Sequence, residues 1–280
     1  MASSKNDESW MEEYWAGTGG AKWIENLIQI EKVLEPIGEK LLHKISPKIG
    51  LNVLDVGCGG AQMAAKLAGL LKPNGKVTAS DISEPIINAA KKHYNSIPNL
   101  EFLCCDVQSY AFDERAFDAV VSRFGVMFFT DPATAFHNIH RSLKSDGTLT
   151  FLAWKTLDEN LWMKVPAFAA YEVLERPEPA AEDEPGPFSM ANQEVVRQLL
   201  EETGFKKISL EEKKVDLNLG SLDDAVHLMT ELGPASRSFI EASEASQIKA
   251  KILMGNALAQ FETPEGIVLP SASWLVEASV

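Results

Sequence analysis

The chain has 280 residues, 45% of them hydrophobic and 24% charged, an ordinary composition for a globular protein with a substantial core. Its formal net charge of -14 and pI near 4.9 argue against a surface built to neutralise phosphates, so neither nucleic acid nor an anionic membrane is an expected partner. No apolar run reaches the roughly 18 residues that a membrane helix needs, and the N-terminal residues lack a signal-peptide pattern, so we expect a cytoplasmic protein.

The N-terminal region is predicted to be helical, because apolar residues recur there at helical spacing and form a stripe that must pack against another part of the protein. The residues of this stripe are Trp23, Leu27, Ile30 and Leu34. Trp15 lies beside Gly17 and Gly19, and an aromatic residue next to a glycine-loosened segment suits a lid that closes over a cofactor. We therefore expect residues 1–50 to form a helical lid over a main domain, residues 51–280.

Short apolar runs then alternate with helical patterns, which is typical of a parallel sheet covered by helices on both faces. The predicted strands are 52–57, 73–81 (after an initial turn), 100–106, 116–124 and 146–154. The predicted helices are 60–71, 84–93 and 131–142. This order predicts a doubly wound, Rossmann-like α/β fold.

The second half of the chain is predicted to complete the sheet and to carry a cap. Residues 206–219 alternate like an antiparallel edge strand, and residues 266–279 read as a final strand. Residues 189–205 predict a helix that ends at Gly204. We expect two substrate-binding cap segments, residues 156–190 and 221–261, of which the first is largely loop and the second, inserted between the last two strands, is helical.

The stretch VLDVGCGGAQ, residues 53–62, ends the first strand in a glycine turn. Gly57 and Gly59 let a ligand approach bare backbone at the carboxyl end of a parallel strand, where open α/β sheets bind ligands. The dinucleotide fingerprint needs a third glycine three positions after the second, and Gln62 stands there instead. Asp55 serves a pyrophosphate badly but suits a cationic ligand. S-adenosylmethionine carries both an ammonium and a sulfonium cation.

The next two strand ends carry groups that fit the nucleoside of the same ligand. Asp81 lies where a carboxylate accepts hydrogen bonds from both ribose hydroxyls, and Ile82 beside it is placed to cover one adenine face. Asp106 is placed to accept from the adenine amino group, while the backbone N–H of Val107 donates to a ring nitrogen. We expect these four residues to bind the nucleoside.

The fourth strand ends in SRFGVMFF, which places Ser122, Arg123 and Phe124 beside the methionyl group of the ligand. Cys58, inside the glycine turn, is expected to contribute its backbone rather than its thiol. With Cys104 and Cys105 it shows no paired spacing, so we predict reduced thiols and no metal site.

The chain resembles the class I S-adenosylmethionine-dependent methyltransferases. The motifs that carry the resemblance, in order, are VLDVGCGGA, ASDIS, CCDVQ and FDAVVSRFGVMFFTDP. The resemblance covers residues 50–155 and implies a seven-stranded sheet whose last strand is antiparallel, with S-adenosylmethionine as the cofactor. Residues 14–36, 185–205 and the closing LPSASWLVEAS are similar to a group of bacterial small-molecule methyltransferases.

The resemblance implies methyl transfer to a small-molecule acceptor, whose accepting atom stays open among oxygen, nitrogen and carbon. The alternatives are a nicotinamide-dependent oxidoreductase and a non-catalytic S-adenosylmethionine-binding protein. His137 and His140 have i,i+3 spacing but no third metal ligand, and we expect them on a solvent-facing helix surface. His227 lies in the expected cap, but no residue is assigned as a catalytic base.

An apolar aromatic pocket is expected for the acceptor, because small-molecule sites are mostly apolar with a few polar groups. Its candidate residues are Trp10, Tyr14, Trp15, Trp154, Trp162 and Phe168.

Overall fold

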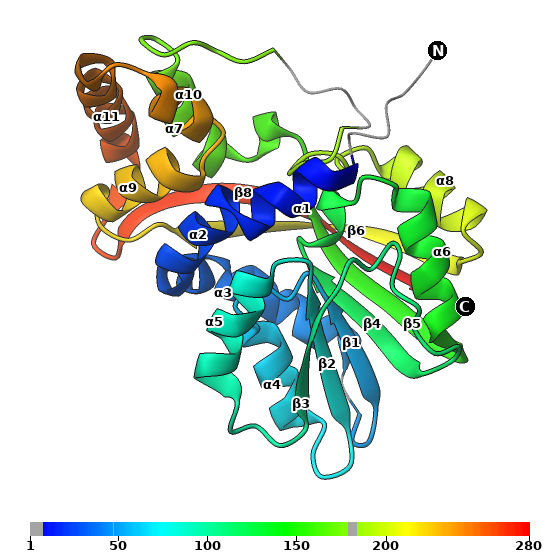
Figure 1. The fold of residues 1–280 in the computed structure, drawn as a ribbon. Coiled ribbons are helices and arrows are strands. Elements are labelled where there is room, and N and C mark those ends of the chain that lie inside the picture. The colour runs from blue at the N-terminus through cyan, green and yellow to red at the C-terminus, as the bar shows by residue number, and fades with distance from the viewer. Residues whose placement is uncertain (1–7, 47, 179–183) are drawn as a thin grey trace.

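The computed structural model of the protein describes residues 8–46, 48–178 and 184–280. Seven strands form one sheet in the order β3-β2-β1-β4-β5-β8-β6, and the two-residue strand β7 pairs with β8 (Figure 1). The strand bounds are β1 Asn52–Val56, β2 Lys76–Asp81, β3 Leu100–Cys104, β4 Phe117–Arg123, β5 Leu143–Trp154, β6 Lys206–Asn218, β7 Glu262–Thr263 and β8 Gly266–Ser279.

The strands β3, β2, β1, β4 and β5 are parallel neighbours, and β8 is antiparallel to both β5 and β6. The predicted seven-stranded sheet with an antiparallel last strand is therefore confirmed. Apolar side chains dominate its centre: Val53, Leu54 and Val56 of β1 are buried, as are Val120 and Val121 of β4. Strands buried on both faces read as continuous apolar runs, which is the pattern that predicted them.

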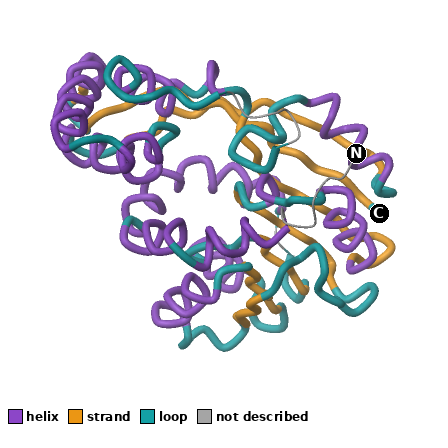
Figure 2. The backbone as a smooth tube through the Cα atoms, turned by 45° about the horizontal axis from the view of Figure 1, so that its top comes forward, coloured by secondary structure: helices purple, strands orange, loops and turns teal. Residues whose placement is uncertain are grey.

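Helices cover both faces of the sheet, as the tube in Figure 2 shows. Their bounds are α1 Glu8–Ala16, α2 Thr18–Glu25, α3 Leu27–Ile45, α4 Gln62–Leu70, α5 Glu84–Tyr94, α6 Pro132–Ser142, α7 Leu161–Ala170, α8 Gln193–Glu202, α9 Leu222–Leu232, α10 Ser236–Glu241 and α11 Glu244–Leu258. The Ser83 hydroxyl accepts from the N–H of Ile86, so α5 begins where the sequence predicts. None of the described helices is both long and apolar enough to cross a membrane.

The predicted N-terminal stripe is divided between two helices. Asn26 ends α2 and precedes α3, with backbone angles of φ -100° and ψ 7° that depart from those of a regular helix. Its side-chain amide donates to the carbonyl of Lys22 and so closes the end of α2. Trp23 therefore belongs to α2, whereas Leu27, Ile30 and Leu34 belong to α3. All four side chains nevertheless face the interior of the protein.

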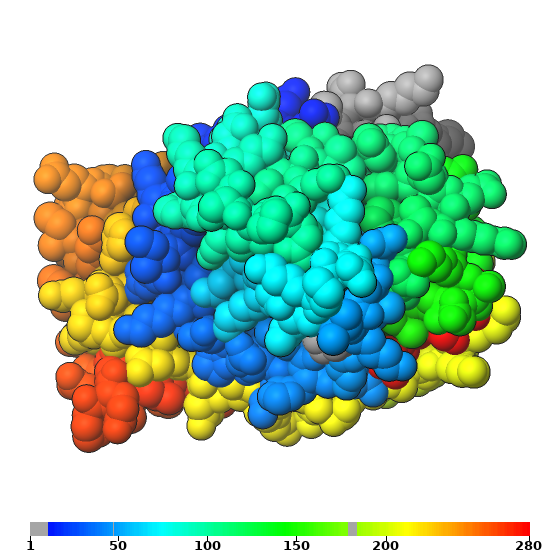
Figure 3. Space-filling model, turned by 90° about the horizontal axis from the view of Figure 1, so that it is seen from below, coloured from blue at the N-terminus to red at the C-terminus, as the bar shows by residue number. Residues whose placement is uncertain are grey.

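The cap lies at one end of the molecule, where β6 and β8 extend beyond the parallel strands (Figure 1). Helices α9, α10 and α11 are inserted between β6 and β8 as predicted, and α7 packs on α11. Helix α7 differs from the prediction, which expected residues 156–190 to be largely loop. Figure 3 shows the N-terminal helices, in blue, between the orange and yellow cap and the cyan and green parallel half.

Candidate active site

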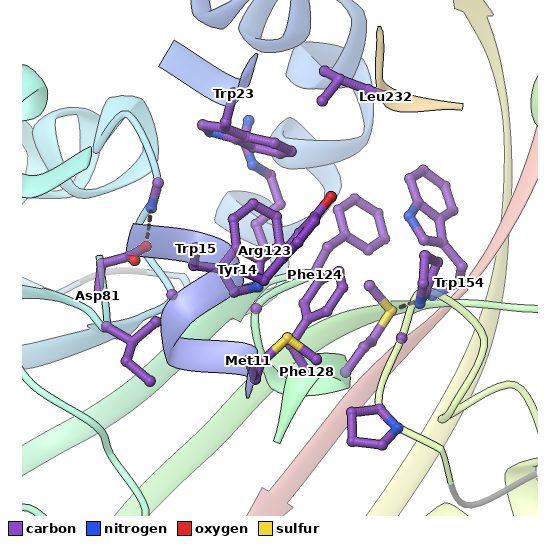
Figure 4. A pocket seen from close by; sticks show the side chains of 18 of the residues that line it. Met11, Tyr14, Trp15, Trp23, Asp81, Arg123, Phe124, Phe128, Trp154 and Leu232 are labelled. Atoms are coloured by element: carbon purple, nitrogen blue, oxygen red, sulfur yellow. Dashed lines mark hydrogen bonds between the residues drawn. The ribbon is translucent and has the colours of Figure 1, made fainter. Parts of the chain in front are cut away.

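A cavity of about 500 Å³ lies at the carboxyl ends of the parallel strands and under the N-terminal helices. Figure 4 shows Asp81 at one end of the cavity, Trp154 at the other, and Tyr14 and Trp15 between them. Nine predicted site residues line it: Trp15, Gly57, Gly59, Asp81, Ile82, Asp106, Val107, Arg123 and Phe124. Parallel strands bring their carboxyl ends to one edge, so residues far apart in the sequence meet here.

The glycine turn after β1 has no room for side chains. Gly57 has φ +65° and Gly59 has φ +52°, a backbone region that other residues rarely adopt. A Cβ atom on Gly57 would lie 2.7 Å from the Cα of Gly125, and one on Gly59 would lie 3.2 Å from Nε1 of Trp23. Both glycines are required by the geometry, and both leave the backbone of the turn open to the cavity.

Asp81, at the end of β2, is joined directly to that turn. Its Oδ2 accepts from the N–H of Gly59 and its Oδ1 from the N–H of Ser83, each at 3.0 Å. A carboxylate oxygen has two lone pairs, so each oxygen retains one acceptor position. Burial raises the pKa of Asp81, while the hydrogen bonds from these N–H groups lower it. The glycine turn and this carboxylate therefore form one rigid unit on the cavity wall.

Asp55 lies beneath the turn rather than on the cavity wall. Only 1% of it is exposed, and its Oδ2 is buried without a hydrogen-bond partner. Burial raises the pKa of Asp55 to about 7; the charge of Arg123 opposes this shift, and the charge of Glu31 adds to it. A neutral acid at this position is therefore close to ionising at ordinary pH.

Arg123, at the end of β4, is paired with Glu31 of α3. One guanidinium nitrogen lies 2.6 Å from Oε2 of Glu31, and both side chains are buried. The second oxygen of Glu31, Oε1, has no partner. Glu31 was not predicted as a site residue. A charged residue inside an amphipathic helical pattern does not indicate its ion-pair partner, and Arg123 lies 92 residues away in the sequence.

The loop after β3 brings Asp106 and Val107 to the cavity beside Ile82. One oxygen of Asp106 accepts from the backbone N–H of Gln108 at 2.9 Å, and the side-chain amide of Gln108 also donates to this carboxylate. The amide oxygen of Gln108 accepts from Thr130, which follows β4. Asp106 thus fixes the loop and also lines the cavity.

Ser122 and Cys58 brace the turn and do not line the cavity. The Ser122 hydroxyl donates to the carbonyl of Val56 at 2.7 Å and accepts from the N–H of Gly125 at 3.1 Å. The backbone N–H of Cys58 donates to the carbonyl of Ser80, and its thiol is buried, which raises its pKa. Neither side chain is available to a ligand in the cavity.

The N-terminal helices close the cavity with aromatic rings. The carbonyl of Trp15 accepts a hydrogen bond of 2.7 Å from the Ser83 hydroxyl, which ties α1 to the start of α5. The Trp15 ring meets the rings of Trp23 and Phe128 edge to face, with centroids 5.9 and 5.3 Å away. The indole N–H of Trp23 is buried next to Gly59 without a partner. The helical spacing of apolar residues places Trp23 in an apolar stripe and does not indicate this donor.

Of the residues predicted for an aromatic pocket, Tyr14, Trp15, Trp154 and Trp162 line the cavity. Phe168 does not: its ring is exposed on α7, with the guanidinium of Arg176 4.5 Å from its centroid. The side chain of Trp10 lies outside the described residues. Phe188 was not predicted for the pocket, but this residue of the expected cap segment 156–190 lines the cavity.

No described histidine lines the cavity. His227 of α9 is exposed, as is His137 of α6. His140 is not solvent-facing as expected: it is half-buried against Phe205, and burial lowers its pKa. Within the described ranges, the acidic, histidine and cysteine side chains form no cluster that could hold a metal ion.

Residues 54–151, which contain the glycine turn and the ends of β2, β3 and β4, match the family described as a methyltransferase domain. Over this segment the chain is similar to methyltransferases. The matched segment includes the predicted glycine-turn, ribose, adenine and fourth-strand motifs. The N-terminal helices and the cap lie outside the matched residues.

Two curated relatives and one solved structure illustrate the similarity. The chain is 30% identical over 132 residues to malonyl-[acyl-carrier protein] O-methyltransferase 1 of Ilyobacter polytropus, covering 47% of this chain and 48% of that one. It is 39% identical over 95 residues to demethylmenaquinone methyltransferase of Chlorobaculum tepidum, covering 34% and 37%. The matches thus span about half of these relatives or less. The fold is similar to Haemonchus contortus phosphoethanolamine N-methyltransferase 2 in complex with S-adenosyl-L-methionine, with a TM-score of 0.60, 15% identity and coverage of 96% and 59%.

Proposed function

We propose that this protein transfers a methyl group from S-adenosylmethionine to a small-molecule acceptor. The observation that carries the proposal is the direct hydrogen bond between the Gly59 N–H and Asp81 on the wall of one cavity. A bare glycine turn accommodates the amino-acid end of the cofactor, and a carboxylate at the next strand end accepts from its ribose. Because the glycine turn and Asp81 are hydrogen-bonded to each other, a single ligand that contains both an amino-acid end and a ribose can contact the two together.

The cofactor's nucleoside is proposed to lie between Asp81 and the loop after β3. Asp81 accepts from the ribose hydroxyls with its two remaining lone pairs. Ile82 packs on the adenine ring, Asp106 accepts from the adenine amino group, and the backbone of Val107 donates to a ring nitrogen. All four residues line the same end of the cavity, which supports this arrangement.

The amino-acid end is proposed to lie over the glycine turn near Trp23. The Trp23 indole N–H is a buried donor without a partner, and a carboxylate is the acceptor that such a donor needs. Beneath the turn, Asp55, Glu31 and Arg123 form a buried group whose net charge is negative when Asp55 is ionised. A cationic ligand above the turn compensates that charge.

Methyl transfer requires little covalent chemistry from the protein, because the cofactor supplies an already activated methyl group. An electron pair on the acceptor forms a bond to the methyl carbon, and the carbon–sulfur bond breaks with its electron pair left on sulfur. If the accepting atom carries a proton, the proton is released to water. The protein's contribution is alignment and exclusion of water, worth roughly 7–11 kcal/mol in the best intramolecular models.

The N-terminal helices are proposed to act as the lid, and segments 156–190 and 221–261 as the acceptor-binding cap. The Ser83 hydroxyl bond to the carbonyl of Trp15 holds the lid against α5, at the nucleoside end of the cavity. We further propose a cytoplasmic location, which rests on the sequence pattern alone and is tested by cell fractionation.

Calorimetric titration with S-adenosylmethionine, with its demethylated product and with NAD tests the proposal. We expect the first two ligands to bind with one site per chain and NAD not to bind, because the third glycine of a dinucleotide site is missing. Preferred binding of NAD would instead support the oxidoreductase alternative. Incubation of metabolite extracts with methyl-labelled cofactor, followed by mass analysis, then tests turnover. Cofactor binding with no labelled product would support the non-catalytic alternative.

A further inference from the structure

The end of the cavity opposite Asp81 has an aromatic wall. Phe124 and Trp154 are stacked, with centroids 3.8 Å apart and planes at 10°, and Trp162 of α7 lies 5.4 Å from Trp154. Phe124 has φ +67°, a region that bulky residues rarely adopt, and its N–H donates to the carbonyl of Leu152. Strained backbone of this kind concentrates at functional sites, and here it fixes a ring in the wall.

A second aromatic wall lines the same cavity. It is formed by Tyr14 and Phe128, which meet the Trp15 ring edge to face, while Trp15 and Trp23 continue the cluster toward the glycine turn (Figure 4). Aliphatic and thioether side chains complete this end of the cavity, which we name the acceptor chamber. They are Met163, Leu228, Met229 and Leu232. A cavity with two aromatic walls and an apolar rim suits a flat ring system.

The acceptor chamber also lacks charge. Among the described residues, Asp81, Asp106 and Arg123 are the charged side chains that line the whole cavity. The two acids lie at the nucleoside end, and Arg123 is already paired with Glu31. A carboxylate, phosphate or ammonium group on the acceptor would therefore enter the chamber without a counter-charge, which is costly in an apolar site.

The described part of the chamber offers no strong base either. Tyr14 is its titratable group, and burial raises the pKa of the phenol, which keeps it neutral. The accepting atom must therefore give up its proton to water or carry none. A ring carbon activated by neighbouring electron donors, or an acidic hydroxyl on an aromatic ring, meets this requirement without help from a side chain.

Resting on the proposed function, we infer that the methyl acceptor is a planar, uncharged ring compound held between the two aromatic walls of the acceptor chamber. The electron pair of a reactive ring carbon, or of a hydroxyl oxygen attached to the ring, forms the new bond to the methyl carbon, sulfur keeps the pair of the broken bond, and the proton of the accepting atom goes to water. Of the two relatives' substrates, this chemistry favours the quinone-like ring over the acyl carboxylate.

Three matched probes test the inference by calorimetry in the presence of saturating S-adenosylhomocysteine, so that no turnover occurs. Naphthol is flat and neutral, naphthoate is flat and charged, and decalinol is neutral but not flat. We expect naphthol to bind at least about tenfold more tightly than either of the others, a difference of about 1.4 kcal/mol. Equal or tighter binding of naphthoate overturns the inference, and so does the absence of binding by all three.

Two positions on α7 give a matched pair of variants. Trp162→Leu removes a ring of the chamber wall and is expected to weaken naphthol binding about tenfold. Phe168→Leu removes an exposed ring on the same helix and should leave it unchanged. Equal effects of the two variants would contradict the chamber assignment. The affinity of each variant for S-adenosylhomocysteine alone tests folding and the proposed cofactor site. Failure of the proposed function is therefore distinguished from failure of the inference about the acceptor.

A charge exchange provides a second test that does not depend on lost affinity. Leu232 lines the chamber from the end of α9. Leu232→Lys supplies the missing counter-charge, so the preference should move from naphthol toward naphthoate. A variant that binds S-adenosylhomocysteine normally and keeps the original preference would show that the charge of the chamber does not select the acceptor.

Discussion

Replacing Asp55 by asparagine tests the electrostatics beneath the glycine turn. In the ligand-free protein, burial raises the pKa of this carboxyl from 3.8 to about 7. Each pKa unit corresponds to about 1.4 kcal/mol, so the ionised form costs about 4 kcal/mol once the pH exceeds 7. Asparagine has nearly the same shape and cannot ionise, so it avoids this cost.

The sign follows from proton binding. Between about pH 4 and pH 7 the folded wild type holds a proton that the unfolded chain has released, so stability falls as the pH rises and levels off above 7. The Asp55→Asn variant lacks this dependence. Its advantage in free energy of unfolding should therefore widen by about 2–3 kcal/mol from about pH 5 to about pH 8.

Urea unfolding of both proteins at the two pH values measures this difference, and other titrating groups largely cancel between them. Cofactor binding gives a second readout: wild-type affinity for S-adenosylmethionine should rise with pH up to about 7, because the cation favours ionised Asp55, whereas the affinity of the variant should be weaker and nearly flat. An advantage of the variant that is identical at both pH values would refute the account of Asp55.

Three further substitutions test the rest of the cofactor site. Asp81→Asn should weaken S-adenosylmethionine binding by about 1.5–3 kcal/mol, measured by calorimetry, since it removes a charged acceptor; unchanged affinity would rule out the ribose contact. Trp23→Phe keeps the ring but removes the unpaired indole N–H, so affinity should fall about tenfold while the melting temperature is maintained; full affinity would exclude the indole as a ligand. Gly57→Ala should lose about 1–2 kcal/mol of stability, because a Cβ meets Gly125 in a left-handed turn. The control Gly69→Ala, on an exposed helix position with open space, should lose none in the same unfolding assay.

The parallel half of the fold was predictable because its signals are local. Each strand is a short apolar run, each ligand residue follows directly at its end, and Ser83 and Asp131 mark the starts of α5 and α6. Once the strands are parallel, their ends must converge. Placing Asp81 next to Gly59 therefore required no knowledge of side-chain packing.

The remaining site depends on contacts between distant segments, which the sequence pattern does not encode. Arg123 was expected beside the ligand, yet it forms an ion pair with Glu31. The packing of α3 against the sheet determines this partner. Phe188 lies in the segment 156–190, whose sequence pattern predicts mostly loop. Tertiary packing alone carries it to the cavity. Ser122 lies at the predicted strand end, but its hydroxyl is used by the backbone of Val56.

The way the cap joins the sheet has a consequence for how such a protein diversifies. The N–H of Leu219 donates to the carbonyl of Ile267, and the N–H of Ile267 donates to that of Gly220, so the chain leaves and re-enters the sheet at adjacent points. A segment whose two ends are fastened side by side can change in length and composition without moving its anchor. Sequence changes confined to the cap between β6 and β8 can therefore adapt the protein to new acceptors. The parallel half, which is proposed to bind the nucleoside, need not change.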